Sequence, residues 1–306
     1  MSVTTVNLYQ QLAQMSGLEV RRDEPMARHT SFGIGGPADI LVIPADTASL
    51  VEVVRTLATA GREPFYIGNG TNLLVRDGGI RGVVVKIAGA LTGIEHDPNH
   101  LISAAGESLA AVCHHAAQQG LSGLEFAAGI PGSVGGAIVM NAGANGGEIA
   151  QVLEWVEAIN AGNEVNRYQR SELDFDYRRS QFQAGRWVIT RVAFVLSPTA
   201  PSQVRQSMYE AVEKRCQRQP VSDRSAGCIF KHPPGDYAGR LLEETDTKGM
   251  RVGGAMISPK HANFIINTGQ ATAADVLELI RRVQDNVEEK FGVHLDTEIC
   301  ICGEDM

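Results

Sequence analysis

Three short segments place ionisable side chains where acid–base or anion-binding chemistry is possible. The first is DFDYRRSQF (174–182), in which two arginines, a tyrosine and a serine lie between aromatic residues. An arginine there can hold a carboxylate or a phosphate by two parallel hydrogen bonds, because its guanidinium group is planar and permanently charged. A solvent-exposed strand with surface salt bridges would have the same composition. This segment alone favours neither interpretation.

The other two segments contain one candidate each. SAGCIFKHPPG (225–235) surrounds Cys228 with small residues and has Lys231 three positions later. A thiol with a pKa of about 8.5 is a competent proton donor at neutral pH, although a free cysteine is more often a buried core residue. Glu298 lies in VHLDTEICI (293–301), on the polar side of an alternating pattern. A glutamate at such a position is usually an ordinary surface carboxylate.

Two glycine-rich segments offer backbone to a ligand. GNGTN (68–72) follows an apolar strand and supplies consecutive N–H groups, which suits a pyrophosphate. It is neither GxGxxG nor a P-loop, and a polar turn is the alternative. FAAGIPGSVGGAIVMNAGANGGE (126–148) has seven glycines among apolar residues, which indicates positive φ or the close approach of another group. The two segments predict a clamp for one long ligand, with phosphates on 68–72 and a flat ring on 130–137. Close backbone packing is the alternative for the second segment.

Helices that position these segments are indicated by apolar residues at helical spacing. Thr272 is the predicted N-cap of the last one, with Asp275 in its first turn and an apolar face that ends at Phe291. The helices expected before it end ahead of Gly17 and at Gly61, or cover 108–119 and 203–219.

Strands are indicated by short β-branched and apolar runs between the helices. They are expected within 29–46 and over 65–67, 73–75, 83–87, 101–104, 152–159 and 293–301. A boundary is expected at Pro198–Ser202, where proline and small residues accumulate. The mixed order with many short connections predicts an α+β fold rather than a regular doubly wound sheet.

Composition narrows the class of protein. The 306 residues are 43% hydrophobic and 20% charged, enough for two or three domains with a core. The formal charge of −8 argues against a nucleic-acid or anionic-membrane partner. Five cysteines without CxxC spacing indicate reduced thiols, with no metal site. Without a signal peptide or an apolar run of membrane length, we expect a cytoplasmic protein. Its oligomeric state is not readable, and a monomer is favoured.

Taken in order, the motifs resemble one family of bacterial flavoenzymes. They span the chain from about residue 7 to Gly303. The matching pieces are HTSFGIGGPAD, YIGNGTNLLVRDGG, GLSGLEFAAGIPGSVGGAIVMNAGANGGE, DYRRSQF, SAGCIFKHP, AGRLLE, GGAMISPKHANFIINTG and FGVHLDTEICICG. The ordered set is similar to the UDP-N-acetylenolpyruvoylglucosamine reductase (MurB) family.

The resemblance implies a fold, a cofactor and a reaction. The implied fold is an FAD-binding region of the vanillyl-alcohol-oxidase (PCMH) type in two α+β subdomains, 1–64 and 65–200, followed by a C-terminal α+β substrate domain, 201–306. The implied reaction reduces UDP-N-acetylglucosamine enolpyruvate to UDP-N-acetylmuramate for peptidoglycan. Hydride passes from NADPH to FAD and then to the enolpyruvyl carbon, and a protein acid protonates the neighbouring carbon.

Residue roles follow from the same resemblance, motif by motif. Arg178 and Glu298 would flank the substrate carboxylate and the enolate-like intermediate, and Cys228 would be the acid. Substrate contacts are expected from Tyr177, Arg178, Lys231, His261 and Asn263. FAD contacts are expected from Ile67, Gly68, Asn69, Gly70, Thr71, Asn72, Gly129, Pro131, Gly132, Ser133, Gly136, Ala137 and Gly143.

The chain departs from the family's commonest pattern at two positions. The acid is usually serine, where this chain has Cys228, and His232 replaces the usual asparagine, which puts one substrate contact in doubt. The short span between Arg178 and Cys228 fits the family's shorter class, which lacks an inserted loop with its tyrosine. Two other functions stay open: an FAD oxidoreductase of the same fold that oxidises an alcohol, and a non-catalytic nucleotide-binding protein.

Overall fold

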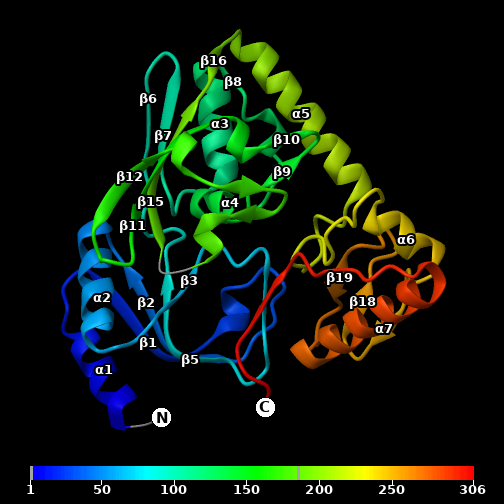
Figure 1. Cartoon of the computed structure of the whole chain (residues 1–306), viewed down its shortest axis with the longest axis horizontal. Helices are drawn as coiled ribbons and strands as arrows, with labels where there is room; N and C mark the ends of the chain where they lie inside the picture. The colour runs from blue at the N-terminus through cyan, green and yellow to red at the C-terminus, as the bar shows by residue number, and fades with distance from the viewer. Residues whose placement is uncertain (1–2, 185–186) are drawn as a thin grey trace. The chain divides into compact units, whose positions relative to one another are not determined.

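The chain divides into two units in a computed structural model that describes residues 3–184 and 187–306 (Figure 1). Unit 1 comprises Met1–Arg22, Ile40–Asn69 and Gly82–Lys214, and unit 2 comprises Asp23–Asp39, Gly70–Arg81 and Arg215–Met306. These contact-based units cross the predicted boundaries, because short pieces of the N-terminal third group with the C-terminal third. The division into 1–64, 65–200 and 201–306 stays a prediction.

A four-stranded sheet lies at the start of unit 1. Its order is β1 (Leu18–Pro25), β2 (Pro37–Pro44), β5 (Ile80–Lys86) and β3 (Phe65–Ile67), and β3 runs parallel to β5. β1, β2 and β5 contribute residues to both units. The helices of this part are α1 (Val3–Ala13) and α2 (Thr47–Thr59). Asp46 caps α2 in a capping box with Ser49, and Gly61, at φ +63°, follows its end as predicted.

A five-stranded antiparallel sheet forms the rest of unit 1. Its order is β12 (Val165–Gln169), β11 (Leu153–Ile159), β15 (Val188–Val195), β7 (His100–Ala104) and β6 (Ile94–His96). Helix α3 (Leu109–Gln119) belongs to this part, and α4 (Val134–Val139) packs against β15 and β7. This packing places the glycine-rich segment directly beside the sheet.

Three two-stranded ladders and several 3₁₀ turns complete unit 1. The ladders are β16 (Ser197–Pro198) with β8 (Leu121–Ser122), β10 (Gly147–Glu148) with β9 (Gly143–Ala144), and β13 (Phe175–Asp176) with β14 (Arg179–Ser180). Among the described residues, the 3₁₀ turns of unit 1 are Glu125–Ala127, Ile149–Gln151, Arg170–Glu172 and Gln181–Gln183, and Met26–Arg28 is a 3₁₀ turn of unit 2.

Unit 2 combines a small sheet with two helices. The sheet is antiparallel, in the order β17 (Arg251–Val252), β18 (Ala255–Ile257) and β19 (Ile265–Asn267). Helix α7 (Ala273–Phe291) packs against β17, β18 and α6 (Ala238–Glu244). The predicted N-cap at Thr272 is confirmed, and Asp275 completes a capping box with it at the start of α7. β4 (Leu73–Val75) pairs in parallel with β20 (Cys300–Cys302).

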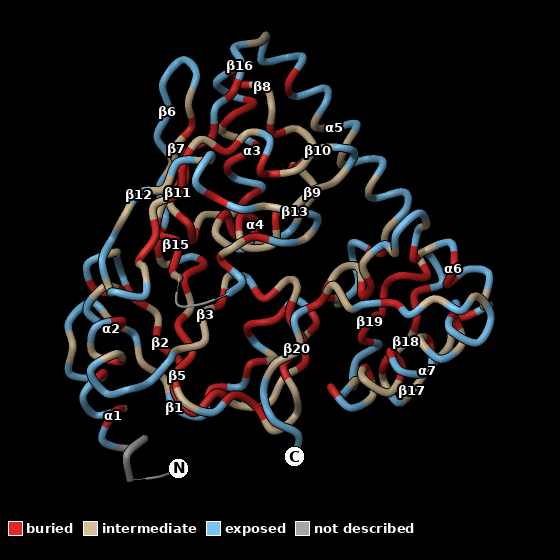
Figure 2. The backbone as a smooth tube through the Cα atoms, viewed as in Figure 1, coloured by how far each residue is buried: buried red, intermediate tan, exposed pale blue. Residues whose placement is uncertain are grey.

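Each unit has its own hydrophobic core, which appears as buried segments in Figure 2. The core of unit 1 gathers apolar side chains from both sheets and from α2, α3 and α4, such as Leu50, Leu109 and Phe194. The core of unit 2 includes Phe32 and Leu74 from the early segments as well as the apolar face of α7. Long α5 (Pro201–Arg218) contributes little, since Val204 is the only buried residue among its described side chains.

Three expectations about elements were wrong or incomplete. The predicted strand over 293–301 is reduced to β20, because its earlier residues form isolated pairings with another segment instead of one ladder. The glycine-rich segment, where no helix was expected, contains the short helix α4. Helix α6 also lies where no helix was expected.

Candidate active site

The two glycine-rich segments meet at the start of α4 in unit 1. Ser133 caps this helix, and its Oγ accepts the Gly136 N–H at 3.4 Å. A Cβ atom at position 68 would overlap the same Oγ. Only glycine therefore allows the turn after β3 to come this close to the helix. The two segments, which were predicted to bind one ligand together, therefore approach each other at Gly68 and Ser133.

Part of the glycine content serves internal packing. The Gly135 N–H donates to the Ala105 carbonyl at 2.8 Å, and the Val134 N–H donates to the Glu107 carbonyl at 2.9 Å. A Cβ atom at position 135 would lie only 3.1 Å from Ala105 Cβ. These bonds fasten α4 to the segment between β7 and α3. At Gly135 the alternative of close backbone packing is therefore correct.

Gly136 has a different environment from Gly135. Among the described residues, a Cβ atom at position 136 would meet only Ser133 Oγ, at 3.4 Å. The neighbouring Gly132 has a φ of +139°, which L side chains rarely adopt. Open space beside glycine backbone at the start of a helix fits the flat ring that the sequence predicted for this segment.

The second half of the GNGTN turn is fixed within unit 2. Gly70 has a φ of +62°, and a Cβ atom there would overlap the His29 carbonyl oxygen. The Ser31 N–H donates to the Gly70 carbonyl at 3.1 Å, and the Cys300 N–H donates to the Asn72 carbonyl at 2.9 Å. Because these two carbonyl oxygens accept hydrogen bonds from the protein, they do not occupy the position where an anion would bind. The turn thus meets one requirement of a pyrophosphate nest.

Arg178 occupies the second position of the two-residue turn between β13 and β14. Its φ of +54° is unusual for arginine, because Cβ crowds the backbone in the left-handed region. Its Nη2 donates to the Gly143 carbonyl at 2.9 Å, and Cζ lies 5.1 Å from the centre of the Tyr177 ring. The guanidinium is half-buried, and Tyr177 is exposed. The positive charge lies beside a residue predicted to hold the cofactor.

Cys228 and Glu298 lie in adjacent segments of unit 2. The carbonyl of Ile229, the residue after Cys228, accepts the Glu298 N–H at 2.7 Å. One residue further on, Phe230 and Thr297 form an antiparallel bridge. Both candidate side chains are partly exposed. The structure therefore brings together two of the three predicted catalytic residues, which are far apart in the sequence.

Asn263, predicted as a substrate contact, supports this pair from below the surface. It is 1% exposed. Its Oδ1 accepts the Phe230 N–H at 2.9 Å, its Nδ2 donates to the Phe230 carbonyl at 2.8 Å, and its own carbonyl accepts the Ile229 N–H at 2.9 Å. In this structure the side chain fixes the backbone that follows Cys228.

His261 and Lys231 border the same segment. His261 Nδ1 accepts the Asn263 N–H at 3.1 Å, so the neutral ring carries its proton on Nε2. Burial is the main effect that lowers the pKa of His261 below its usual value. The Lys231 N–H donates to the Asp296 carbonyl at 2.9 Å. His232, at the position of departure from the family pattern, accepts the Ala238 N–H on Nδ1 at 3.4 Å.

Sequence reasoning missed the residues that hold the candidates in place. Asn72 was predicted only as a cofactor contact, but its Nδ2 donates to the Glu298 carbonyl at 3.1 Å. Asn141 and Ser180, which were not singled out, are 0% and 3% exposed; Asn141 donates to the Asp176 carbonyl near Arg178, and Ser180 donates to the Val139 carbonyl at the end of α4. Small polar residues near glycines are also typical of exposed turns, so the pattern could not show that these are buried.

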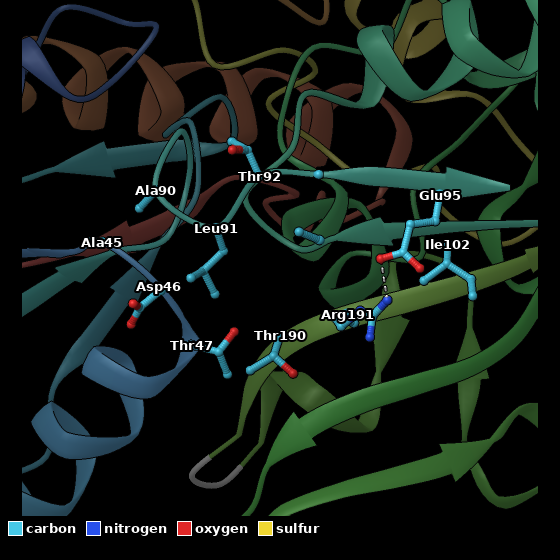
Figure 3. A pocket seen from close by; sticks show the side chains of 12 residues that line it. Ala45, Asp46, Thr47, Ala90, Leu91, Thr92, Glu95, Ile102, Thr190 and Arg191 are labelled. Atoms are coloured by element: carbon cyan, nitrogen blue, oxygen red, sulfur yellow. Dashed lines mark hydrogen bonds and ion pairs between the residues drawn. The ribbon is translucent and has the colours of Figure 1, made fainter. Parts of the chain in front are cut away.

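A pocket of unit 1 lies away from these candidate residues. It has a volume of about 260 Å³ and contains none of the predicted site residues (Figure 3). Arg191 at its wall is paired with Glu95 at 3.0 Å, and Thr190 donates to Glu157 at 2.8 Å. Asp46 faces it from the start of α2, where it caps that helix. Because these polar groups are paired within the protein, the pocket gives no sign of a ligand.

Comparisons with known proteins match two parts of this chain to family models. Residues 38–168 match the model of an FAD binding domain, and residues 219–302 match that of the UDP-N-acetylenolpyruvoylglucosamine reductase C-terminal domain. A relative named UDP-N-acetylenolpyruvoylglucosamine reductase, from Caldanaerobacter subterraneus, is 46% identical over 92% of this chain and 93% of its own. The chain belongs to this reductase family. A relative of the same name from Clostridium botulinum is 45% identical over 92% of each chain.

A solved structure shares the fold as well. The family's reductase (MurB) from Thermus caldophilus superposes with a TM-score of 0.80 and 38% identity, covering 93% of this chain and 98% of that chain. The protein is thus a flavin-dependent oxidoreductase with an α+β FAD-binding fold, and the predictions of family, fold class and FAD are confirmed. FAD fits the space beside Gly136, where a Cβ atom would meet only Ser133 Oγ among the described residues.

Other features of the described residues concern metals, thiols and membranes. Within 3–184 and 187–306, no group of three or more His, Cys, Asp or Glu side chains is arranged to hold a metal ion. All five cysteines are free thiols, and burial raises the pKa of Cys113 and of Cys302 to about 12. No helix in the described part of the chain has both the length and the apolar character needed to cross a bilayer.

Proposed function

We propose that this protein reduces UDP-N-acetylglucosamine enolpyruvate to UDP-N-acetylmuramate, with NADPH as the hydride donor, in the synthesis of peptidoglycan precursors. The observation that carries the proposal is the juxtaposition of Cys228 and Glu298 through the Glu298 N–H and the Ile229 carbonyl, at 2.7 Å, in a chain of this family. FAD held by the backbone at Gly68–Asn72 and Gly132–Gly136 would supply the hydride chemistry, with NADPH as the source of the hydride.

Arg178 and Glu298 have electrostatic roles in the proposal. The Arg178 guanidinium binds the enolpyruvyl carboxylate and stabilises negative charge that develops next to it as the double bond is reduced. Its bond to the Gly143 carbonyl, at 2.9 Å, limits the positions that the charged group can take. Glu298 orients the reacting end of the substrate. Tyr177, Lys231 and His261 provide further contacts to the UDP-sugar.

Cys228 supplies the proton. Addition of hydride to one carbon of the double bond leaves the neighbouring carbon with an electron pair, and the Cys228 S–H bond breaks to protonate it. The resulting thiolate recovers a proton from solvent before the next turnover. Asn263 keeps this segment in place through its two bonds to Phe230. The backbone at Gly68–Asn72 and Gly132–Gly136 holds FAD.

The test follows the colour of the flavin under anaerobic conditions. NADPH should bleach the purified protein, and UDP-N-acetylglucosamine enolpyruvate should restore the colour with formation of UDP-N-acetylmuramate. An alcohol oxidase of the same fold would instead be bleached by its alcohol, and a non-catalytic protein would respond to neither. Bleaching by NADPH without recovery on addition of the enolpyruvyl substrate would rule out the proposed reaction.

A further inference from the structure

Asn141 is a fully buried amide immediately after α4. Its φ is +42°, a left-handed conformation that asparagine tolerates better than most residues. The side chain is 0% exposed, its Oδ1 accepts the Ala150 N–H at 3.1 Å, and its Nδ2 donates to the Asp176 carbonyl at 3.0 Å. The partners are a backbone donor and a backbone acceptor, so the orientation of the amide is fixed. Aspartate lacks the donor, and glycine lacks both groups.

These bonds anchor the hairpin that carries Arg178. Asp176 is the last residue of β13, directly before the two-residue turn, and Ser180 lies on β14. The Ser180 Oγ, 3% exposed, donates to the Val139 carbonyl at 2.7 Å. Both strands of the hairpin are therefore tied to the chain at the end of α4. The anchors oppose the conformational cost of the left-handed backbone at Arg178.

The anchors also relate Arg178 to the glycine-rich segment. Asn141 is two residues before Gly143, whose carbonyl accepts Arg178 Nη2 at 2.9 Å. If the Asp176 carbonyl loses its donor, the turn can shift and the guanidinium moves relative to Gly143. A shift of about 1 Å in a positioned group can lower a rate by about 10²-fold.

We propose that Asn141 is a positioning residue for Arg178: by holding the Asp176 carbonyl it sets the place of the guanidinium beside the FAD-binding segment, without touching substrate or flavin. The inference rests on the proposed function, in which Arg178 acts on the substrate carboxylate. It predicts a defect in one half-reaction only, whereas a residue needed merely for folding would affect flavin binding and both half-reactions together.

The experiment compares Asn141→Asp with Asn145→Asp in the holoenzyme. Aspartate at position 141 keeps the acceptor for Ala150 but places an oxygen against the Asp176 carbonyl. Asn145 is the matched control, because it also has positive φ, +54°, in the next hairpin turn but is exposed. Stopped-flow absorbance follows flavin reduction by NADPH and flavin reoxidation by the enolpyruvyl substrate separately. Asn141→Asp should slow reoxidation by about 10²-fold with reduction and flavin content unchanged, and Asn145→Asp should match the wild type.

A double-mutant cycle shows whether the effect passes through Arg178. Combining Asn141→Asp with Arg178→Ala should give a reoxidation rate no lower than that of Arg178→Ala alone, because the positioned group is already absent. Multiplying defects would overturn the inference while leaving the role of Arg178 intact. Normal reoxidation in Arg178→Ala would overturn the proposed role of Arg178, and the inference with it.

Ser180→Ala tests the same anchor if Asn141→Asp does not fold. It removes one hydroxyl without adding charge and should slow reoxidation in the same selective way, by less than Asn141→Asp. Equal losses of flavin, reduction and reoxidation in Ser180→Ala would show that the anchor only maintains the fold, and the inference would then be wrong.

Discussion

The hairpin that carries Arg178 in unit 1 and the paired segments that carry Cys228 and Glu298 in unit 2 are held by different kinds of bonds. The hairpin is local, its turn contains a left-handed arginine, and its fastening depends on the side chains of Asn141 and Ser180. In unit 2, segments from distant parts of the sequence are joined mainly by backbone hydrogen bonds. Backbone bonds survive side-chain substitution, whereas side-chain anchors do not.

An asparagine amide nevertheless supports a catalytic candidate in each unit. Asn141 donates to the carbonyl of Asp176, near Arg178, and Asn72 donates to the carbonyl of Glu298 itself. Both asparagines lie in glycine-rich segments predicted to contact FAD. The two cases differ because Glu298 has a second backbone hydrogen bond: its N–H donates to the Ile229 carbonyl at 2.7 Å. Substitutions at Cys228 and Glu298 should therefore report on chemistry, while substitutions around Arg178 also report on geometry.

The largest effect is expected at Cys228. Cys228→Ala removes the proposed acid and should lower turnover by about 10²–10⁴-fold, the usual contribution of a positioned acid. Cys228→Ser should keep much of the activity, since a hydroxyl is the usual donor of the family at this position. Because the backbone of this segment is held by Asn263 and Asp296, neither variant should lose its flavin. Full turnover in Cys228→Ala would remove the residue from the mechanism.

Alkylation tests the same residue chemically. Cys216 and Cys300 are exposed, so the measurement uses a background in which both are replaced, Cys216→Ser with Cys300→Ser. Cys113 and Cys302 should react slowly, because burial raises the pKa of each thiol to about 12. Iodoacetamide should inactivate this protein at Cys228, and bound substrate should protect it. Slow inactivation that substrate does not change would indicate a structural cysteine.

The next largest effect concerns the two charged candidates. Arg178→Ala should slow reoxidation of the flavin by the substrate about 10²–10³-fold, as loss of one stabilising donor does, while reduction by NADPH stays close to normal. Glu298→Gln should act on the same half-reaction, because it keeps the shape and removes the charge. Separate stopped-flow traces check both variants. A defect confined to reduction by NADPH would contradict the assignment.

Substitutions at two glycines distinguish the effect of backbone packing on stability from the effect of free space on FAD binding. Gly70→Val should destabilise the protein, because the left-handed φ alone costs about 1–2 kcal/mol and the side chain would overlap the His29 carbonyl. Gly136→Ala should not destabilise the apoprotein, since alanine is favoured in helices by about 1 kcal/mol and its Cβ meets only Ser133 Oγ in the described structure. It should nevertheless weaken FAD binding.

Thermal unfolding and bound-flavin absorbance measure these two properties. Wild-type flavin content in Gly136→Ala would show that the cofactor does not use that space. An unchanged unfolding midpoint in Gly70→Val would show that the turn can move away from His29.

Sequence patterns predicted the elements that depend on local chemistry. Apolar spacing, together with Gly61 after α2 and Thr272 before α7, identified these two helices to within two residues, because the stabilising groups are near neighbours in the chain. The strand over 293–301 was overestimated, since its pairing depends on segments around Ile229 and Asn72 that local alternation does not reveal. Helix α4 was missed because it contains glycine, which is a poor helix former. Glycine is needed at position 135 because the helix packs closely on Ala105.

The candidate site was predicted as a set of residues but not as an arrangement. Family motifs named Arg178, Cys228 and Glu298, whereas the contact between the Cys228 and Glu298 segments is a tertiary property. Asn263 illustrates the difference: the motif predicted a substrate contact, and the structure shows a buried amide bonded to Phe230. A motif records that a residue is required, and burial and hydrogen bonds are needed to say what it does.

The smallest predicted effect is a pH dependence of stability from His261. Burial lowers the pKa of His261 in the folded protein, with Lys248 and His232 acting in the same direction and Glu243 opposing them. Its Nδ1 is also engaged by the Asn263 N–H, a bond that requires an unprotonated nitrogen. The unfolded chain therefore binds the proton more readily than the folded protein does. The stability contributed by the neutral ring should be fully present above the unfolded pKa of about 6.5 and should fall as pH decreases below it.

His261→Asn keeps an acceptor for Asn263 without a titrating group, so its unfolding midpoint should fall less than that of the wild type between neutral and mildly acid pH. His114→Asn, at an exposed position on α3, is the control and should follow the wild type. Chemical unfolding at a series of pH values makes the comparison, and identical pH profiles for wild type and His261→Asn would show that His261 does not hold its neutral form in the folded protein.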